Sequence, residues 1–372
     1  ASRAGDASNM ADFQQTPILP TRRPGSSAEA LAWRKYTHPL IFRHKAAPSH
    51  VEFSPVAPHD FCVVNSLQVD IFSARTNSVY RTLTRFKDTV CCASYRQDGK
   101  MLAASDESGV TQLFDLSSRA VMRTMRGHTK AVRAVRFSPD GSRLFTGSDD
   151  TRVLVWDVAA EQELRALDGH SDMVRCVRVS GAHGHAASAH RLLLSGSYDH
   201  TVRLWDVSAP KPVMTLRMPD PVEDVALLPG GGMVAVANGN QLTICDLLSG
   251  GKAVQSILAH SKAITCLHAD ADGHLLSGGL DRFVKVYDLA RYKVLSSIMY
   301  DAPLLSLALS PTRSHLVAAL ANGTTCVRRQ RAAAAAADAA PRPARDDPTA
   351  RPAGAKPGQV AVTDGIAQRY DG

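Results

Sequence analysis

The sequence predicts an all-β fold, a seven-bladed β-propeller closed by an N-terminal strand and followed by a low-complexity C-terminal tail. An apolar pair, or a degenerate form of it, recurs seven times at steps of 42, 42, 49, 40, 42 and 41 residues. Within each unit apolar and polar residues alternate, as at 201–205, which is the period of a strand and not of a helix. A unit of this length holds four short strands, the content of one propeller blade. The second residues of the seven pairs are Phe72, Phe114, Trp156, Trp205, Cys245, Tyr287 and Arg328.

The ends of the repeat region indicate how the ring closes. The last unit has strand-like runs at 304–309, 315–320 and 324–329 but lacks a fourth. The run 39–43 has no partner of its own, and an open ring would leave exposed edges, so we expect it beside 324–329. The propeller is therefore expected to span residues 39–330. Residues 1–38 are expected to form an N-terminal extension, and the Ala-, Pro- and Arg-rich residues 331–372 a linker or disordered tail.

Composition narrows the class of protein. With 372 residues, 44% of them hydrophobic and 21% charged, wholesale disorder is excluded. No apolar run approaches the roughly 18 residues that cross a bilayer, and residues 1–15 resemble no signal peptide. We therefore expect a soluble protein without membrane contact. The net charge of +8 lies mainly in the ends of the chain, because residues 51–327 hold 28 basic against 27 acidic residues.

Neither a metal nor a cofactor is predicted. The seven cysteines are an odd number without metal-site spacing, and Cys62, Cys176, Cys266 and Cys326 lie in apolar stretches, which favours buried free thiols in a reducing compartment. The longest loop, 180–191, carries three histidines, but no Cys or carboxylate joins them to make a metal site.

Further marks recur inside the units in a fixed order. Gly-His or Ala-His opens units three, four and six, a second strand ends in a triplet such as Thr146-Gly147-Ser148, and an Asp stands six residues before the end of the apolar pair. This order is typical of WD repeats, and the resemblance implies that each His, Asp, strand hydroxyl and aromatic residue form a buried hydrogen-bonded chain. A hydrolase triad is the alternative, but a catalytic triad would not be repeated blade after blade. The implied structural tetrads contain His128, Asp150 and Trp156; His170, Asp199 and Trp205; and His260, Asp281 and Tyr287.

Several strings resemble one WD-repeat family, the one numbered fifteen among the proteins associated with the U-three small nucleolar RNA. They lie at 85–99, 127–132, 197–202, 221–232 and 279–287, and the resemblance covers Trp33 to Arg329. It implies a non-enzymatic scaffold in the nucleolus, a subunit of the small-subunit processome that acts in pre-rRNA processing and supports ribosomal DNA transcription. The implied partners are WD-repeat and helical subunits of the t-UTP (UtpA) subcomplex, in the context of pre-rRNA and the U-three particle. In the family a helical C-terminal domain follows the propeller, whereas this sequence continues only into 331–372.

Two other functions are alternatives to this one. A substrate receptor of a cullin ubiquitin ligase commonly carries Arg two residues after the Asp of a Trp-Asp pair, but here those positions are Ser117, Ala159 and Ser208. An enzyme would need clustered carboxylates, metal-spaced histidines or a phosphate loop, none of which the sequence shows.

A local excess of basic residues is the candidate surface for RNA or a partner. Residues 116–139 hold six basic and no acidic side chains, and alignment on the Gly-His marks gives two of them equivalents in unit four. Like charges brought together favour an anion such as a phosphate backbone, unless Asp149, Asp168 and Asp172 pair with them. The candidate residues are Arg119, Arg123, Arg126, Lys130, Arg133, Arg136, Arg175 and Arg178.

Overall fold

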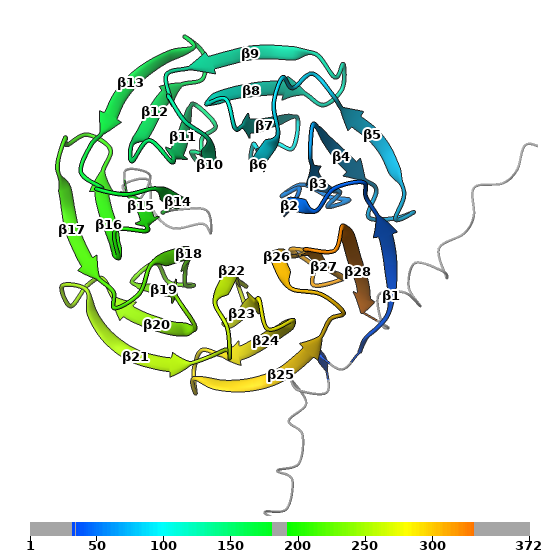
Figure 1. The fold of residues 1–372 in the computed structure, drawn as a ribbon, viewed down its shortest axis with the longest axis vertical. Helices are drawn as coiled ribbons and strands as arrows, with labels where there is room; N and C mark the ends of the chain where they lie inside the picture. The colour runs from blue at the N-terminus through cyan, green and yellow to red at the C-terminus, as the bar shows by residue number, and fades with distance from the viewer. Residues whose placement is uncertain (1–31, 34, 181–191, 331–372) are drawn as a thin grey trace, which may run out of the picture.

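Seven four-stranded antiparallel sheets form a closed ring in the computed structural model, which describes residues 32–33, 35–180 and 192–330 (Figure 1). In the first six blades the strands pair in sequence order, and the first strand of each lies innermost. The predicted all-β, seven-bladed propeller is confirmed. Residues 181–191, the histidine loop, and residues 331–372, the predicted tail, lie outside the described residues.

The strands of the first three blades follow one another along the chain. Blade 1 comprises β2 (Pro48–Phe53), β3 (Phe61–Asn65), β4 (Gln68–Phe72) and β5 (Val79–Leu83). Blade 2 comprises β6 (Val90–Tyr95), β7 (Met101–Asp106), β8 (Val110–Asp115) and β9 (Val121–Arg126). Blade 3 comprises β10 (Val132–Phe137), β11 (Arg143–Ser148), β12 (Val153–Asp157) and β13 (Gln162–Leu167).

The remaining blades continue the ring. Blade 4 comprises β14 (Val174–Val179), β15 (Leu192–Ser197), β16 (Thr201–Asp206) and β17 (Pro212–Arg217). Blade 5 comprises β18 (Val222–Leu227), β19 (Met233–Asn238), β20 (Gln241–Asp246) and β21 (Lys252–Leu258). Blade 6 comprises β22 (Ile264–Ala269), β23 (His274–Gly279), β24 (Phe283–Asp288) and β25 (Lys293–Met299). Blade 7 comprises β26 (Leu304–Leu309), β27 (His315–Leu320), β28 (Thr324–Gln330) and β1 (Tyr36–Arg43).

The N-terminal strand closes the ring as predicted. β1 pairs antiparallel with β28, Leu40 opposite Val327 and Arg43 opposite Thr324, so both ends of the propeller share blade 7. β1 begins at Tyr36, three residues before the predicted start, and its register shifts between Thr37 and Leu40. Pro39 lies within that shift, where the strand needs no donor from its backbone.

The predicted N-terminal extension contributes two buried aromatic side chains. Trp33 and Tyr36 stack with ring centroids 5.4 Å apart, and Trp33 meets the edge of His274 at 5.7 Å. Both lie in a core cluster with residues of blades 6 and 7, where they are only 4% and 5% exposed. Trp33 and the first residue of β1 therefore pack across the junction between these blades.

The hydrophobic core lies between adjacent blades. One cluster joins Phe145 and Val155 of blade 3 to Val177 and Trp205 of blade 4. The glycine of the Thr-Gly-Ser triplet stands at such a contact, because a Cβ on Gly147 would lie 2.8 Å from methyl carbons of Val174 and Val177. The repeated glycine thus lets the next blade approach the backbone closely.

Candidate functional site

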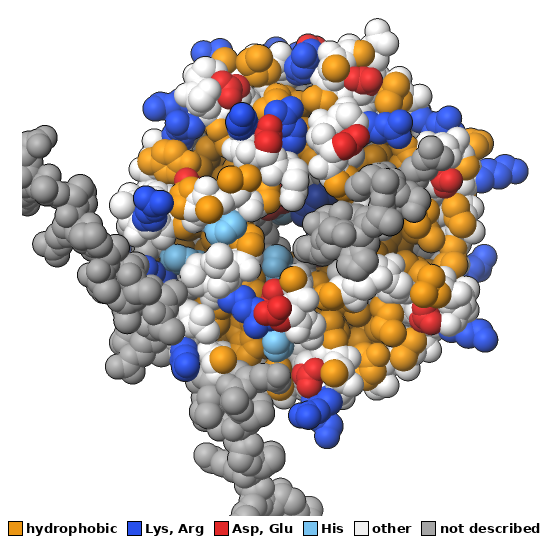
Figure 2. Space-filling view, turned by 180° about the vertical axis from the view of Figure 1, so that it is seen from behind, with side chains coloured by type: hydrophobic (Ala, Val, Ile, Leu, Met, Phe, Trp, Pro, Cys, Tyr) orange, Lys and Arg blue, Asp and Glu red, His pale blue; other side chains and the backbone are white. Residues whose placement is uncertain are grey.

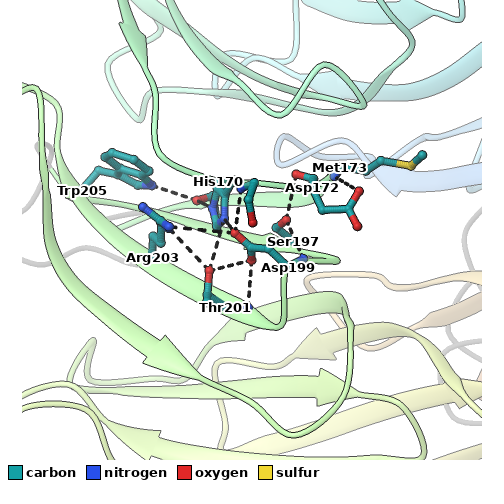
Figure 3. A network of polar contacts seen from close by, with 10 residues as sticks. His170, Asp172, Met173, Ser197, Asp199, Thr201, Arg203 and Trp205 are labelled. Carbon is teal, nitrogen blue, oxygen red and sulfur yellow. Dashed lines mark hydrogen bonds and ion pairs between the residues drawn. The ribbon is translucent and has the colours of Figure 1, made fainter.

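The predicted residues of blades 3 and 4 lie in continuous hydrogen-bonded chains. In blade 4 the Nδ1 atom of His170 is 2.8 Å from a carboxylate oxygen of Asp199, and its Nε2 atom is 2.7 Å from the hydroxyl oxygen of Ser195. The indole N–H of Trp205 donates to the same hydroxyl at 2.8 Å (Figure 3).

Blade 3 repeats this arrangement with a threonine in place of the serine. His128 is 2.8 Å from both Asp150 and the hydroxyl of Thr146, and the indole N–H of Trp156 donates to that hydroxyl at 2.9 Å. Thr146 supplies the chain hydroxyl, while Ser148 donates to the carbonyl of Lys130.

One assignment of hydrogens satisfies every group of these chains. The indole N–H of tryptophan only donates, so the strand hydroxyl accepts that bond and keeps its own hydrogen to donate to the Nε2 atom of the histidine. The Nδ1–H group of the histidine then donates to the aspartate. Asp199 also accepts the backbone N–H of Ser171 at 3.1 Å.

Blade 6 holds a shorter version of the chain. His260 is 2.9 Å from Asp281 and 2.6 Å from the hydroxyl of Ser277. Tyr287 occupies the position of the tryptophan and is 1% exposed, but its hydroxyl makes no hydrogen bond of normal geometry with the described residues. A phenol carries its polar atom at the tip of the ring and not on the ring edge, so it does not reproduce the indole contact.

Burial and hydrogen bonding perturb the ionisation of these chains. Burial lowers the pKa of His170 and of His260, although the neighbouring aspartates work in the opposite direction. Burial would raise the pKa of Asp150, but the bonds from His128, Thr129 and Arg152 lower it to about 2. Burial therefore favours the neutral imidazole at His170 and His260, and hydrogen bonding favours the charged carboxylate at Asp150.

We predict from these shifts that the protein loses stability as the pH falls below about 6.5. A histidine with a lowered native pKa takes up its proton more readily in the unfolded chain, so its contribution is complete above 6.5 and is lost as the pH falls toward the native pKa. Burial and then Arg329 lower the pKa of His315 to about 4, so its contribution to stability is lost on acidification in the same way. Urea unfolding at fixed ionic strength between pH 7.5 and 5 should give a falling free energy of unfolding. His315→Gln should reduce the slope, and a free energy that stays level or rises on acidification would contradict the assignment.

The eight basic residues of the candidate surface do not form one surface. Arg119 lies in the exposed turn after β8, Arg123 and Arg126 lie on the outer strand β9, and Lys130 is exposed between β9 and β10. The other four lie on the inner strands and line the central channel: Arg133 and Arg136 on β10, and Arg175 and Arg178 on β14. Sequence alignment placed these four correctly at equivalent positions, but an alignment in one dimension does not separate the rim of a blade from the channel.

Carboxylates offset most of this basic charge. Arg133 bonds Asp149 at 2.8 Å and lies 3.6 Å from Glu107, and Arg175 lies 3.4 Å from Glu223. Asp149 was one of the three acids weighed as partners, whereas Asp168 pairs instead with Arg152.

The deeper channel arginines are paired as well, Arg136 with Glu52 at 2.7 Å and Arg178 with Asp224 at 2.6 Å. Sequence analysis missed Glu52, Glu107 and Asp224 as functional residues, since these acids come from three other blades. The signal available was that Glu52 and Asp224 occupy inward-facing positions of first strands, where charge is unusual.

Three further properties concern the described part of the chain alone. Its histidines, cysteines and carboxylates include no group of three that could hold a metal ion. Over the same residues no helix has the length and apolar character required to cross a membrane. All seven cysteines are free thiols, and six of them are buried.

Comparison with known proteins identifies the repeats and the family. The model of the WD domain, G-beta repeat, matches residues 119–157, 161–206 and 251–288. The chain is 45% identical over 323 residues to the U3 small nucleolar RNA-associated protein 15 homolog of Bos taurus, which covers 87% of this chain and 60% of that protein. It is 39% identical to the homolog of Gallus gallus, over 85% of this chain and 60% of that protein, and 35% identical to the protein of Schizosaccharomyces pombe, over 82% and 61%.

The chain is a WD-repeat propeller of the U3 small nucleolar RNA-associated protein 15 family. This confirms the resemblance found in the sequence strings. The chain spans about 60% of the length of the curated relatives that it matches.

Proposed function

We propose that this protein is a non-enzymatic scaffold subunit of the small-subunit processome, acting in the nucleolus in pre-rRNA processing and small ribosomal subunit biogenesis, and supporting ribosomal DNA transcription. The observation that carries the proposal is 35–45% identity, over 82–87% of this chain, to proteins named for their association with U3 small nucleolar RNA. Its partners are proposed to be the WD-repeat and helical subunits of the t-UTP subcomplex.

The geometry of the repeated polar chains supports a non-catalytic role. The hydroxyls of Thr146, Ser195 and Ser277 belong to residues that are 0% exposed, so none of them is a nucleophile that a substrate can reach. Each hydroxyl is already bonded to a histidine. These groups hold strands together inside a blade and leave the outer surfaces of the ring for partners.

Co-purification of RNA tests the proposed function. The tagged 372-residue chain, expressed in cells, should retain U3 small nucleolar RNA and precursor ribosomal RNA well above the level retained by the tag alone. It should also concentrate in the nucleolus. Retention of neither RNA at a level above the tag, with the protein folded and present in the nucleus, would contradict the proposal.

Within this function we propose that direct RNA contact uses the part of the basic set that lacks carboxylate partners. Arg126 and Lys130 are exposed and form no ion pair with the described residues, whereas the charges of Arg133 and Arg175 are offset. With purified protein and a pre-rRNA fragment, Arg126→Ala with Lys130→Ala should weaken binding and reduce the salt slope by about two phosphate contacts. Arg133→Ala with Arg175→Ala is the matched comparison. A loss confined to Arg133→Ala with Arg175→Ala would contradict the proposal and assign RNA contact to the channel mouth, and an equal loss in both pairs would contradict a contact restricted to the unpaired residues.

A further inference from the structure

The seven inner strands enclose a channel of about 850 Å³ along the axis of the ring. The space-filling view shows its opening at the centre of one face (Figure 2). Because every blade is the same antiparallel meander, the seven inner strands run in the same direction. Their first residues therefore line one mouth, and their last residues line the other.

The two mouths differ in chemistry. The mouth at the strand beginnings is polar and contains the pairs of Arg133 with Glu107 and of Arg175 with Glu223. The mouth at the strand ends, called the apolar mouth below, is lined mainly by apolar side chains, among them Phe53, Val179, Leu227, Leu228 and Leu309, although His268, Asp270 and Ser310 also line the cavity there. A ligand entering from the apolar side meets hydrophobic side chains first and charged groups at depth.

Between the mouths the carboxylates are well supplied with donors. Glu52 accepts the hydroxyl of Ser94 at 3.0 Å and the backbone N–H of Tyr95 at 3.1 Å, besides the guanidinium of Arg136. Asp224 accepts the backbone N–H groups of Val225 and Leu267 at 2.8 and 2.9 Å, besides Arg178. Each carboxylate thus has three donors, two of which are not arginines.

The two guanidinium groups have more N–H donors than hydrogen bonds to the described residues. Arg136 uses only Nη1, for Glu52 and the carbonyl of Val135, and Arg178 uses Nη2 for Asp224 and Nη1 for the carbonyl of Val177. Each guanidinium carries five N–H groups, and among the described residues no hydrogen bond occupies the others. The middle of the channel therefore has more donors than acceptors.

A half-buried histidine lies at the same place. His50 lines the channel, and its Nδ1 atom is buried without a hydrogen-bond partner among the described residues. Burial, then Arg136 and Arg178, lower its pKa well below the ordinary value, so both guanidinium groups lie within electrostatic reach of one imidazole. Side chains from blades 1, 3 and 4 thus converge on the axis.

We propose that this channel binds a partner peptide, which inserts an Asp or Glu side chain between Arg136 and Arg178 with apolar neighbours packed in the apolar mouth. The carboxylate supplies the acceptors that the two guanidinium groups lack. Arg136 of blade 3 meets Glu52 of blade 1 beside the inner strand of blade 2, where Glu52 also bonds Ser94 and Tyr95. The apolar mouth matches hydrophobic side chains and not a phosphate backbone. The proposal concerns a peptide site on the ring and stands whether or not the processome is the setting.

Peptide selection tests the site directly. A displayed library of random heptapeptides, selected on the immobilised 372-residue chain, should enrich Asp or Glu next to apolar residues. Synthetic copies of the enriched peptides should bind in calorimetry, and replacing their acid by Asn or Gln should raise the dissociation constant about tenfold to a hundredfold. Arg136→Gln with Arg178→Gln should raise the dissociation constant of the unchanged peptides to the same extent. Arg217→Gln removes an exposed arginine outside the channel and should bind the peptides as the unchanged protein does.

Folding and competing ligands are controlled separately. The thermal melt of each variant is recorded. If the double variant does not fold, Arg178→Lys decides the outcome, because lysine keeps the charge but lacks the paired N–H donors of the planar guanidinium. No enrichment, enrichment of peptides without an acid, or equal binding to Arg178→Lys and the unchanged protein would overturn the proposal. Binding of a twelve-nucleotide oligouridylate that is lost in the channel variants would also overturn it, and would assign the channel to nucleic acid.

Discussion

A chain lacking residues 1–45 is expected to unfold at a temperature at least about 10 °C lower than the same chain lacking only residues 1–31. The longer deletion removes β1, which leaves the ladder of β28 unpaired, and it removes Trp33 and Tyr36 from the junction of blades 6 and 7. Deleting large buried aromatic side chains costs roughly 3–5 kcal/mol each, and a stability of about 5–15 kcal/mol is typical of a domain. For a domain of this size each kcal/mol corresponds to roughly 2–4 °C.

The shorter deletion is the reference, because it keeps every residue that contacts the ring through Trp33 and β1. Calorimetry of both proteins at equal concentration measures the difference. Coincident melting curves would show that blade 7 is stable with three strands and that β1 does not hold the ring closed.

Trp205→Ala should lower the free energy of unfolding by roughly 3–5 kcal/mol. The indole is fully buried between blades 3 and 4, and its N–H ends the chain that runs through Ser195 and His170 to Asp199. Trp205→Phe keeps most of the ring and should lose less, about 1–2 kcal/mol, because Ser195 still bonds to His170. Urea unfolding followed by circular dichroism measures both variants.

The exposed side chain of Leu258 provides the matched control for this series. It is 72% exposed on the outer strand β21, so Leu258→Ala should change stability by no more than about 0.5 kcal/mol. Trp156→Ala in blade 3 should behave like Trp205→Ala, and His128→Ala should cost about 1–3 kcal/mol. A Trp205→Ala protein as stable as the Leu258→Ala protein would rule out a structural role for the hydrogen-bonded chain of blade 4.

The blade count and the hydrogen-bonded chains could be predicted because each rests on residues close in sequence. His170 and Trp205 belong to one blade, and the Gly-His and Asp marks recur at fixed offsets, so repetition reveals the marks and the resemblance to WD repeats implies how they bond. Closure by β1 was predictable for a different reason, since the last unit lacked a strand and the first had one to spare.

Contacts between non-adjacent blades could not be predicted from the repeat. Glu52 and Arg136 are 84 residues apart and meet only because the ring brings blades 1 and 3 to a common axis. Between the adjacent blades 4 and 5, the pairing of Arg175 with Glu223 depends on which inner residues face the channel. The repeat describes a single blade, whereas the pairing of charges in the channel is a property of the assembled ring. The sequence therefore shows the excess of basic residues but not the carboxylates that offset it.

The pairing of Tyr36 with Gln330 has a consequence for how the protein is made. At roughly 5–20 residues per second a ribosome needs about 15–60 s to add the residues that separate them, so β1 leaves the ribosome long before its partner strand exists. The intervening blades can form in order as they emerge, since their strands pair with near neighbours. During that interval the edge of β1, which carries Leu40 and Ile41, is open to pairing with other chains. The N-terminal strand is therefore the part of a newly made protein that most needs a chaperone, until synthesis has passed residue 330.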